Sequence, residues 1–373
     1  MLIIKRSDFD SLINALKAES YAVVGPMVRD KAVVYDEVRS TSDFPVGWTD
    51  EQEHSHYRLK KGSVASLFGY SVGPHSWKRY LLPPRERVVA MTKKGKNIEI
   101  ERDESREHSP RFAFIGVRSC ELHAMEIQDK VFMNEQFTDP GYAQRRSDAF
   151  VVAVNCTQSS GTCFCSSMKT GPRVKGRFDV LLTEVLENGD HYFVAETGSE
   201  KGSEILKEVP HKNASPVQVE AARKLVEENK AHMRKVMNID GVKELLEANL
   251  ESSHWEDVGH RCLMCANCTL VCPTCFCTTI DDTTDLSGER AERWRRWDSC
   301  FMMDFAKVTG GNFRPSPKAR YRQWLTHKLS TWVEQFGTFG CVGCGRCITW
   351  CPVGIDITAE VQAIRNNGAK VEG

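Results

Sequence analysis

Residues 262–273 read CLMCANCTLVCP, and residues 341–352 read CVGCGRCITWCP. Both stretches follow the pattern Cys-x2-Cys-x2-Cys-x3-Cys-Pro, so the chain carries two copies of one cysteine motif. Cysteines separated by two residues on a tight loop have poor geometry for disulfides. Their thiolates can instead converge on one inorganic centre, and the two copies therefore predict a metal-binding region in the last third of the chain.

The spacing is typical of proteins that bind two 4Fe–4S clusters. In these proteins three closely spaced thiolates hold one cluster, and the fourth cysteine of the same run binds the other cluster. The predicted ligands of the first cluster are Cys262, Cys265, Cys268 and Cys351. The predicted ligands of the second cluster are Cys341, Cys344, Cys347 and Cys272.

Zinc is the alternative to iron, since closely spaced thiolates also form tetrahedral zinc sites. Zinc ribbons, however, pair two Cys-x2-Cys knuckles across a longer gap and do not add a third cysteine followed by Cys-Pro. Disulfides fit less well, because the chain has 15 cysteines, an odd number, and no stretch that resembles a signal peptide. The spacing therefore favours iron–sulfur clusters.

Charge and hydropathy limit the partners and the cellular location that we expect for this chain. Lys+Arg and Asp+Glu number 50 each, so the net charge gives no reason to expect nucleic acid or an anionic membrane as partner. The N-terminal apolar run is too short for a secretory signal, and no run approaches the length of about 20 residues that spans a membrane. The sequence predicts a cytoplasmic protein without a membrane span.

We expect an α+β fold in three parts. Residues 1–205 should form a mixed α/β domain, residues 206–250 a helical bridge, and residues 251–373 a mainly helical, ferredoxin-like domain with the two clusters. Between the two cysteine runs, residues 289–308 and 321–336 are rich in helix formers and aromatic residues. Both segments are therefore expected to be helical.

The clearest local unit of the first part is a βαβ pattern. Residues 112–117 and 149–154 predict strands, and the second has the uninterrupted apolar run of a parallel strand that is buried on both faces. Between them Ser119 is a candidate N-cap, and residues 121–132 have helical spacing. Further strands are expected at 22–24, 32–35, 88–91, 180–183 and 192–194, and an ordered loop at 63–84.

Four other cysteines belong to this βαβ unit and its following loop. Because parallel strands deliver their carboxyl ends to one edge of the sheet, the four thiols should meet there and could bind a third iron–sulfur cluster. The helix N-terminus should also lower the thiol pKa of the first of them. Buried structural cysteines are the equally weighted alternative, and His123 could substitute as a ligand. The four cysteines are Cys120, Cys156, Cys163 and Cys165.

The remaining three cysteines have less defined roles. Cys275 and Cys277 are expected to line the pocket of the first cluster without binding iron, and Cys300, which has no visible partner, is expected to be a packing residue. The chain lacks dinucleotide, P-loop, zinc-protease and nucleophile-elbow motifs. We therefore expect no bound flavin or nicotinamide and no catalytic residues, which leaves electron transfer as the supported chemistry.

With these residues laid out, the chain resembles the β subunit of soluble NADP-linked nickel–iron sulfhydrogenases, and the related A subunit of anaerobic sulfite reductase. The resemblance runs over nearly the whole length, with Ser119 at a position often held by proline. The motifs that carry it are FIGVRSCE at 114–121, NCTQSSGTCFCSSM at 155–168, CPTCFC at 272–277, RYRQW at 320–324 and CVGCGRCITWCPVGID at 341–356.

The resemblance implies a place in a hetero-oligomeric oxidoreductase. This chain would relay electrons between a subunit that binds flavin and NAD(P)H and a nickel–iron hydrogenase module. One alternative is the same role in anaerobic sulfite reductase. Others are a self-contained iron–sulfur enzyme with catalysis at the third site, or a redox sensor.

Overall fold

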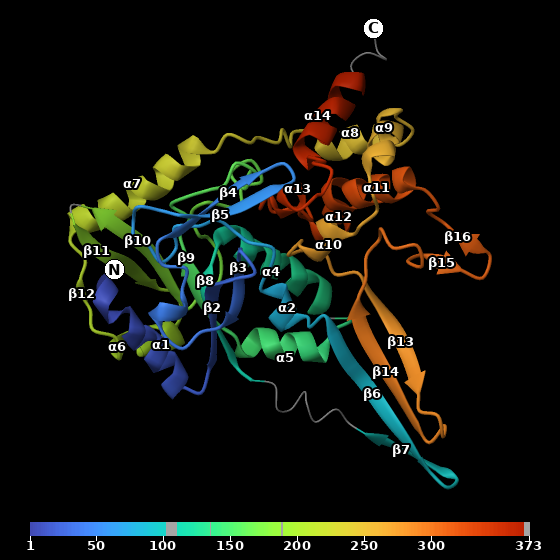
Figure 1. Cartoon of the computed structure of the whole chain (residues 1–373), viewed down its shortest axis with the longest axis horizontal. Helices are drawn as coiled ribbons and strands as arrows, with labels where there is room; N and C mark the ends of the chain where they lie inside the picture. Colours follow the sequence, from blue (N-terminus) through green and yellow to red (C-terminus); the bar gives the residue numbers. More distant parts are fainter. Residues whose placement is uncertain (102–109, 135, 188, 369–373) are drawn as a thin grey trace.

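The computed structural model describes residues 1–101, 110–134, 136–187 and 189–368. Most of the first half of the chain is built on one eight-stranded sheet, in the order β12-β1-β11-β10-β9-β8-β2-β3 (Figure 1). Its strands are β1 (Leu2–Lys5), β2 (Ala22–Arg29), β3 (Ala32–Glu37), β8 (Phe112–Val117), β9 (Phe150–Val154), β10 (Val180–Glu187), β11 (Asp190–Thr197) and β12 (Lys212–Asn213).

The centre of this sheet is parallel and its flanks are antiparallel. Strands β2, β8, β9 and β10 pair in parallel, as the apolar run of β9 predicts, and every residue of β9 is buried. Helix α4 (Ser119–Phe132) follows β8, and α5 (Pro140–Asp148) precedes β9. The predicted βαβ unit is confirmed, but Arg118 and not Ser119 takes the N-cap position of α4.

Helices cover both faces of the sheet because successive strand residues point to opposite sides. On one face α1 (Phe9–Ala18) and α6 (Glu200–Lys207) pack on Ile115 and Val152. On the other face α4 and α5 pack on Phe114 and Val151, and α7 (Pro216–His232) packs on β10 and β11. The predicted bridge helix α7 is therefore part of the α/β layer, whereas α8 (Val242–Ala248) packs in the C-terminal core.

The second half is helical around the cysteine runs. The predicted helix at 321–336 is confirmed as three continuous helical segments: α11, a π-helical turn and α12. The elements of this part are α9 (His254–Arg261), α10 (Asn267–Leu270), α11 (Pro317–Thr326), the π-turn His327–Thr331, α12 (Trp332–Phe336), α13 (Arg346–Thr349) and α14 (Ile357–Gly368). Their shared core is rich in aromatic rings, among them Trp255, Tyr321 and Trp324.

The expectation of a helix at 289–308 is wrong. Residues Arg290–Trp297 form strand β14, which pairs with β13 (Thr278–Thr284) and with β6 (Arg85–Lys94) from the first part of the chain. With β7 (Asn97–Glu101) they make a four-stranded sheet that projects from the body as an arm (Figure 1). Cross-strand pairing with a segment some 200 residues earlier overrides the local helix preference. The C-terminal part is therefore less helical than expected.

Shorter elements complete the chain. The loop at 63–84 is ordered as predicted, with one helical turn, and its aromatic residues Phe68, Tyr70 and Trp77 are buried. No helix of the described residues is long and apolar enough to cross a membrane. The remaining elements are β4 (Trp48–Glu53), β5 (His56–Lys61), α2 (Lys78–Leu81), β15 (Lys307–Val308), β16 (Gly311–Asn312) and the 3₁₀ turns Arg6–Asp8 and Thr41–Asp43.

A buried ion pair joins the two halves of the chain. Arg346 of α13, which is 0% exposed, contacts Glu121 of α4, 1% exposed, with 2.5 Å between nitrogen and oxygen. The same guanidinium donates to the carbonyls of Gly73 (2.8 Å) and His75 (2.9 Å). Glu121 also accepts from the Tyr35 hydroxyl (3.0 Å) and the Trp77 indole (3.0 Å).

We predict that Glu121→Gln destabilises the protein by about 3–5 kcal/mol, because the substitution leaves a buried guanidinium without its counter-charge. The midpoint of urea unfolding should fall accordingly. Glu220→Gln is the matched control, since its partner Arg223 lies beside it on exposed α7, and it should leave the midpoint unchanged. Equal midpoints for the two variants would show that the buried pair contributes little.

Candidate metal centres

The first predicted ligand set gathers where α9 ends and α10 begins. Cys262, Cys265, Cys268 and Cys351 line one hollow, together with apolar side chains that include Phe301 and Trp324. The backbone turns sharply here, since Met264 and Ala266 have φ of 51° and 66°. Backbone N–H groups point at sulfur on both runs: Met264, within this turn, donates to Cys262 Sγ (3.4 Å), and Ile355, on the second run, donates to Cys351 Sγ (3.3 Å).

The second set is more deeply enclosed. Burial first, and then the neighbouring thiols of Cys341, Cys344 and Cys272, raise the pKa of Cys347 well above its ordinary value. Burial likewise raises the pKa of Cys341 to about 12. The structure thus brings Cys272, from the first run, beside the three cysteines of the second run. These are the neighbours that the crossed arrangement requires, while ligation itself stays a prediction.

Two glycines allow the second run to lie against the first half of the chain. Gly343 and Gly345 have φ of 65° and 77°. A Cβ on Gly343 would lie 2.7 Å from the Phe164 carbonyl, and one on Gly345 would lie 2.5 Å from the Thr162 carbonyl oxygen. A hydrogen bond stabilises this close approach, since the Phe164 N–H donates to the Gly343 carbonyl (2.8 Å). Only glycine combines this conformation with this spacing.

Buried cations surround Cys272. The Lys328 ammonium, on the π-turn, donates to Cys272 Sγ (3.2 Å). Burial by itself would lower the pKa of Lys328, but the thiolates of Cys272, Cys275 and Cys341 outweigh it and hold the pKa well above the ordinary value. Lys78 donates to the carbonyls of Cys272 and Cys275 (3.1 Å each), and burial lowers its pKa. Buried cations of this kind are suited to an anionic, thiolate-ligated centre.

The third predicted set also comes together, next to the second. Cys120 lies in the first turn of α4, and Cys156 lies two residues after β9. Cys165 is within electrostatic reach of Cys163, Cys156 and Cys344, and Cys120 is within reach of Cys165 and Cys344. Whether these four thiols bind a cluster remains a prediction.

Cys120 and His123 both lie on α4, and the structure bears on the prediction made for each. The predicted lowering of the Cys120 pKa is wrong: burial, and then the thiols of Cys165 and Cys344, raise the pKa well above its ordinary value. Desolvation of a fully enclosed thiolate outweighs a helix terminus. His123, the possible substitute ligand, bonds through Nδ1 to the Ser119 carbonyl at 2.9 Å, as a packed helical histidine does.

The spacing of the thiols does not fit a single zinc ion. Zn–S bonds of 2.3 Å in a tetrahedron bring sulfur atoms to about 3.8 Å from one another. Within the described ranges, the one group of three or more candidate ligand atoms within 4.8 Å is His254, Asp257 and Glu360, and it contains no cysteine. Arg261 already pairs with both acids of that group. The wider spacing of the cysteines suits clusters, in which iron and sulfide atoms separate the protein ligands.

The last three cysteines differ from expectation. Cys275 hydrogen-bonds to Cys272 and so lies at the second set, not in the first pocket. Cys300 does have a partner, because its thiol hydrogen-bonds to that of Cys277. Cys300 also packs against the C-terminal core, as expected, whereas its contact with Cys277 carried no sequence signal. Residues 278 to 297 form a hairpin whose two ends lie side by side, which brings Cys277 next to Cys300. The spacing of the cysteines in the sequence does not predict this contact.

Several charged residues at the site carried no sequence signal of their own. Arg118 is buried and donates to the carbonyls of Phe68 (2.8 Å) and Tyr70 (3.0 Å). Arg346 hydrogen-bonds to Cys344 as well as to Glu121. Arg118 and Glu121 lie inside the motif at 114–121, and Arg346 lies inside the second cysteine run. Their place in these motifs is the only sequence feature that could have indicated a role at the site. Lys328 lies in no motif.

Comparison with known proteins identifies the family of this chain. Residues 261–355 match the family described as a 4Fe–4S dicluster domain. Over 364 residues the chain is 30% identical to the sulfhydrogenase 2 subunit beta of Pyrococcus furiosus, and the alignment covers 96% of each chain. No solved structure matches. The chain therefore belongs to the family of sulfhydrogenase β subunits, with a 4Fe–4S dicluster domain in its C-terminal part.

Proposed function

We propose that this chain is the electron relay of a multi-subunit hydrogenase, between a subunit that binds flavin and NAD(P)H and a nickel–iron module. The curated relative is named as a subunit of a sulfhydrogenase, and that name favours hydrogenase over sulfite reductase as the complex. A 4Fe–4S cluster supplies one-electron transfer. The protein's part is to hold, space and insulate such centres in a fixed order.

The observation that carries the proposal is that the three cysteine sets adjoin one another. Cys268 of the first set is a neighbour of Cys347 of the second. Cys344 of the second set is a neighbour of Cys120 and Cys165 of the third. Val72, Val342 and Trp332 pack around the junction of the second and third sets. A row of centres insulated by apolar side chains is what a relay needs.

The first and second sets of this row differ in exposure. Cys265 is exposed, and its neighbour Leu263 is 64% exposed, so the first set is open to a partner subunit. Cys344, by contrast, is buried, and Lys328 and Arg346 lie next to the second set. These cations should raise the reduction potential of a cluster at the second set. We propose the cytoplasm as location, because its reducing conditions keep thiols available for clusters.

Replacing Cys351 tests the crossed ligation. Cys351→Ala should damage the cluster that Cys262, Cys265 and Cys268 are proposed to hold, although Cys351 belongs to the other run. The matched variant Cys347→Ala should damage the cluster proposed at Cys341 and Cys344. Iron analysis and EPR distinguish the two. Loss of the same cluster in both variants would contradict the crossed assignment.

Replacing Lys328 tests the second set. Lys328→Met should lower the reduction potential of the cluster proposed at Cys272, on the order of 100 mV for one charge at short range. The sign follows because the reduced cluster carries the extra negative charge that the ammonium stabilises. An EPR-monitored redox titration measures it. Lys318→Met, on α11 and paired with Glu256, is the control and should leave the potential unchanged.

Iron content tests the third set. Three clusters correspond to about twelve irons per chain, and two clusters to about eight. If Cys120, Cys156, Cys163 and Cys165 hold a cluster, Cys165→Ser should reduce the iron from about twelve to about eight. A wild-type chain with about eight irons would make these four cysteines structural.

Removing the subunit tests the relay itself. A complex without this chain should keep hydrogen chemistry with an artificial dye, because the catalytic module is untouched. It should lose most of the activity that depends on the natural electron donor. The purified chain with dye alone should turn over no substrate. Turnover by the isolated chain would replace the relay by the self-contained enzyme.

A further inference from the structure

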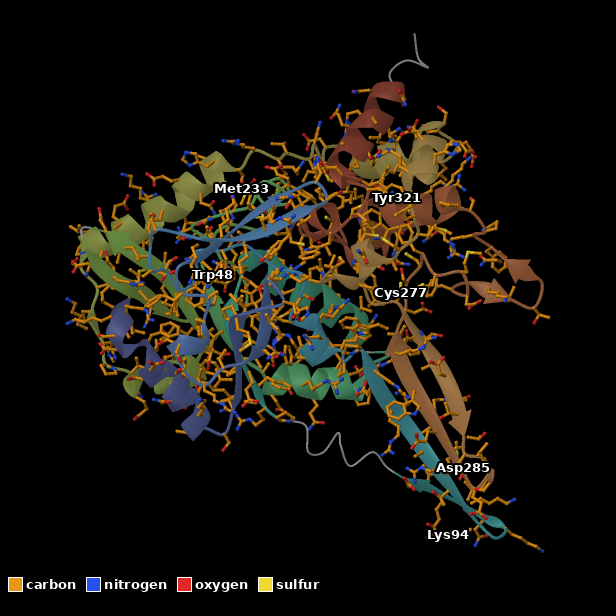
Figure 2. All side chains as sticks on the ribbon, in the orientation of Figure 1. Trp48, Lys94, Met233, Cys277, Asp285 and Tyr321 are labelled. Carbon is orange, nitrogen blue, oxygen red and sulfur yellow. The ribbon has the colours of Figure 1, made fainter. Side chains whose placement is uncertain are left out.

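Cys277 and Cys300 stand at the base of the projecting arm, outside all three proposed cluster sets. Cys277 precedes β13, and Cys300 lies three residues after β14. Thr278 pairs with Trp297 at the open end of the hairpin, opposite its turn, and the Asp298 N–H donates to the Cys277 carbonyl (2.8 Å). This pairing brings the two thiols into a hydrogen bond. Figure 2 locates Cys277 where the arm meets the helical part.

The surroundings fit a thiol pair better than a metal site. Both cysteines are half-buried. In the described part of the chain neither belongs to a group of three candidate ligand atoms within 4.8 Å. The Arg320 guanidinium donates to the Cys300 carbonyl (2.8 Å), which holds that residue in place. The two thiols are fixed in contact and have no third candidate ligand beside them among the described residues, so they form a dithiol pair and not a metal site.

We propose that Cys277 and Cys300 are a reversible dithiol–disulfide site that exchanges electrons with the adjacent iron–sulfur centre. On oxidation both S–H bonds break, one S–S bond forms, and two protons and two electrons leave. The 4Fe–4S clusters that the cysteine sets would hold would supply one-electron acceptors for these two electrons, and one-electron donors when the disulfide opens. The site goes beyond the relay, because it couples a two-electron step to one-electron carriers.

The position of the pair supports this exchange. Cys300 is within electrostatic reach of Cys268, a predicted ligand of the first cluster. Hydrogen bonding from Cys300, above all, lowers the pKa of Cys277 to about 7, against the raising effect of burial. The lowered pKa favours the Cys277 thiolate, which is the form that attacks a disulfide or forms one. Cys300 is then the thiol that completes the bond.

A thiol-trapping titration on the complete cluster-loaded chain tests the proposal. The protein is equilibrated without oxygen in mixtures of reduced and oxidised dithiothreitol, quenched in acid, and alkylated with iodoacetamide while unfolded. Peptide mass spectrometry should show Cys277 and Cys300 losing alkylation together. The ratio of disulfide to dithiol should change tenfold for each tenfold change in the reagent ratio, as two-electron exchange requires.

Variants separate this site from a metal site. Cys277→Ser and Cys300→Ser should each abolish the oxidisable pair and leave the iron content per chain unchanged. Cys275→Ser, on the same segment but in contact with Cys272, is the matched control and should keep the pair. Full alkylation of both wild-type cysteines at every reagent ratio that preserves the iron would overturn the proposal. A fall in iron in either Cys277→Ser or Cys300→Ser would also overturn it, since the thiols would then be ligands.

Discussion

The buried ion pair between Arg346 and Glu121 is the contact on which the arrangement of cysteines depends. Arg346 stands between Cys344 and Cys347, and Glu121 follows Cys120, so one ion pair joins the second cysteine run to the third thiol set. A fully buried guanidinium is costly unless its charge and hydrogen bonds are satisfied. Here the carboxylate balances the charge, and this carboxylate and two backbone carbonyls accept from Nε and Nη2, whereas Nη1 has no hydrogen-bond partner among the described residues. The pair therefore specifies the docking of the two halves as well as contributing to their stability.

Around this contact, segments from the first half of the chain cover the second cysteine run. The hairpin β4–β5 reaches over it, with Ser55 donating to the Cys351 carbonyl (2.7 Å) and His54 contacting Asp356 (2.8 Å). The loop around Phe164 lies against the second run, and Lys78 reaches the backbone of the first. A short bacterial ferredoxin lacks such a cover. The cover excludes water from the second set and leaves the first set near the surface, so the two sites differ in environment although their motifs are alike.

The arm shows how a local pattern can mislead. Residues 290–297 contain many residues that favour helices, yet they form the strand that bridges β13 and β6. The pairing joins a hairpin from the cluster region to one from the α/β region, so the predicted boundary between the two parts is crossed by a continuous sheet. Because β13 and β14 pair antiparallel, the end of β14 lies beside the start of β13, and Cys300 therefore meets Cys277. The wrong helix prediction and the unforeseen contact between Cys277 and Cys300 have this single cause.

The sequence alone predicted the cluster ligands and determined the two cysteine motifs, the βαβ unit and the family, because each depends on residues that are close along the chain. Spacing of two or three residues dictates which thiols can share a centre, and an apolar run dictates a buried strand. The tertiary structure decided the rest. It set Lys328 and Arg346 beside thiols, paired Cys277 with Cys300, and raised the pKa of Cys120 against its helix terminus. Burial and contact between distant segments control charge and reactivity, and neither can be read from neighbours in sequence.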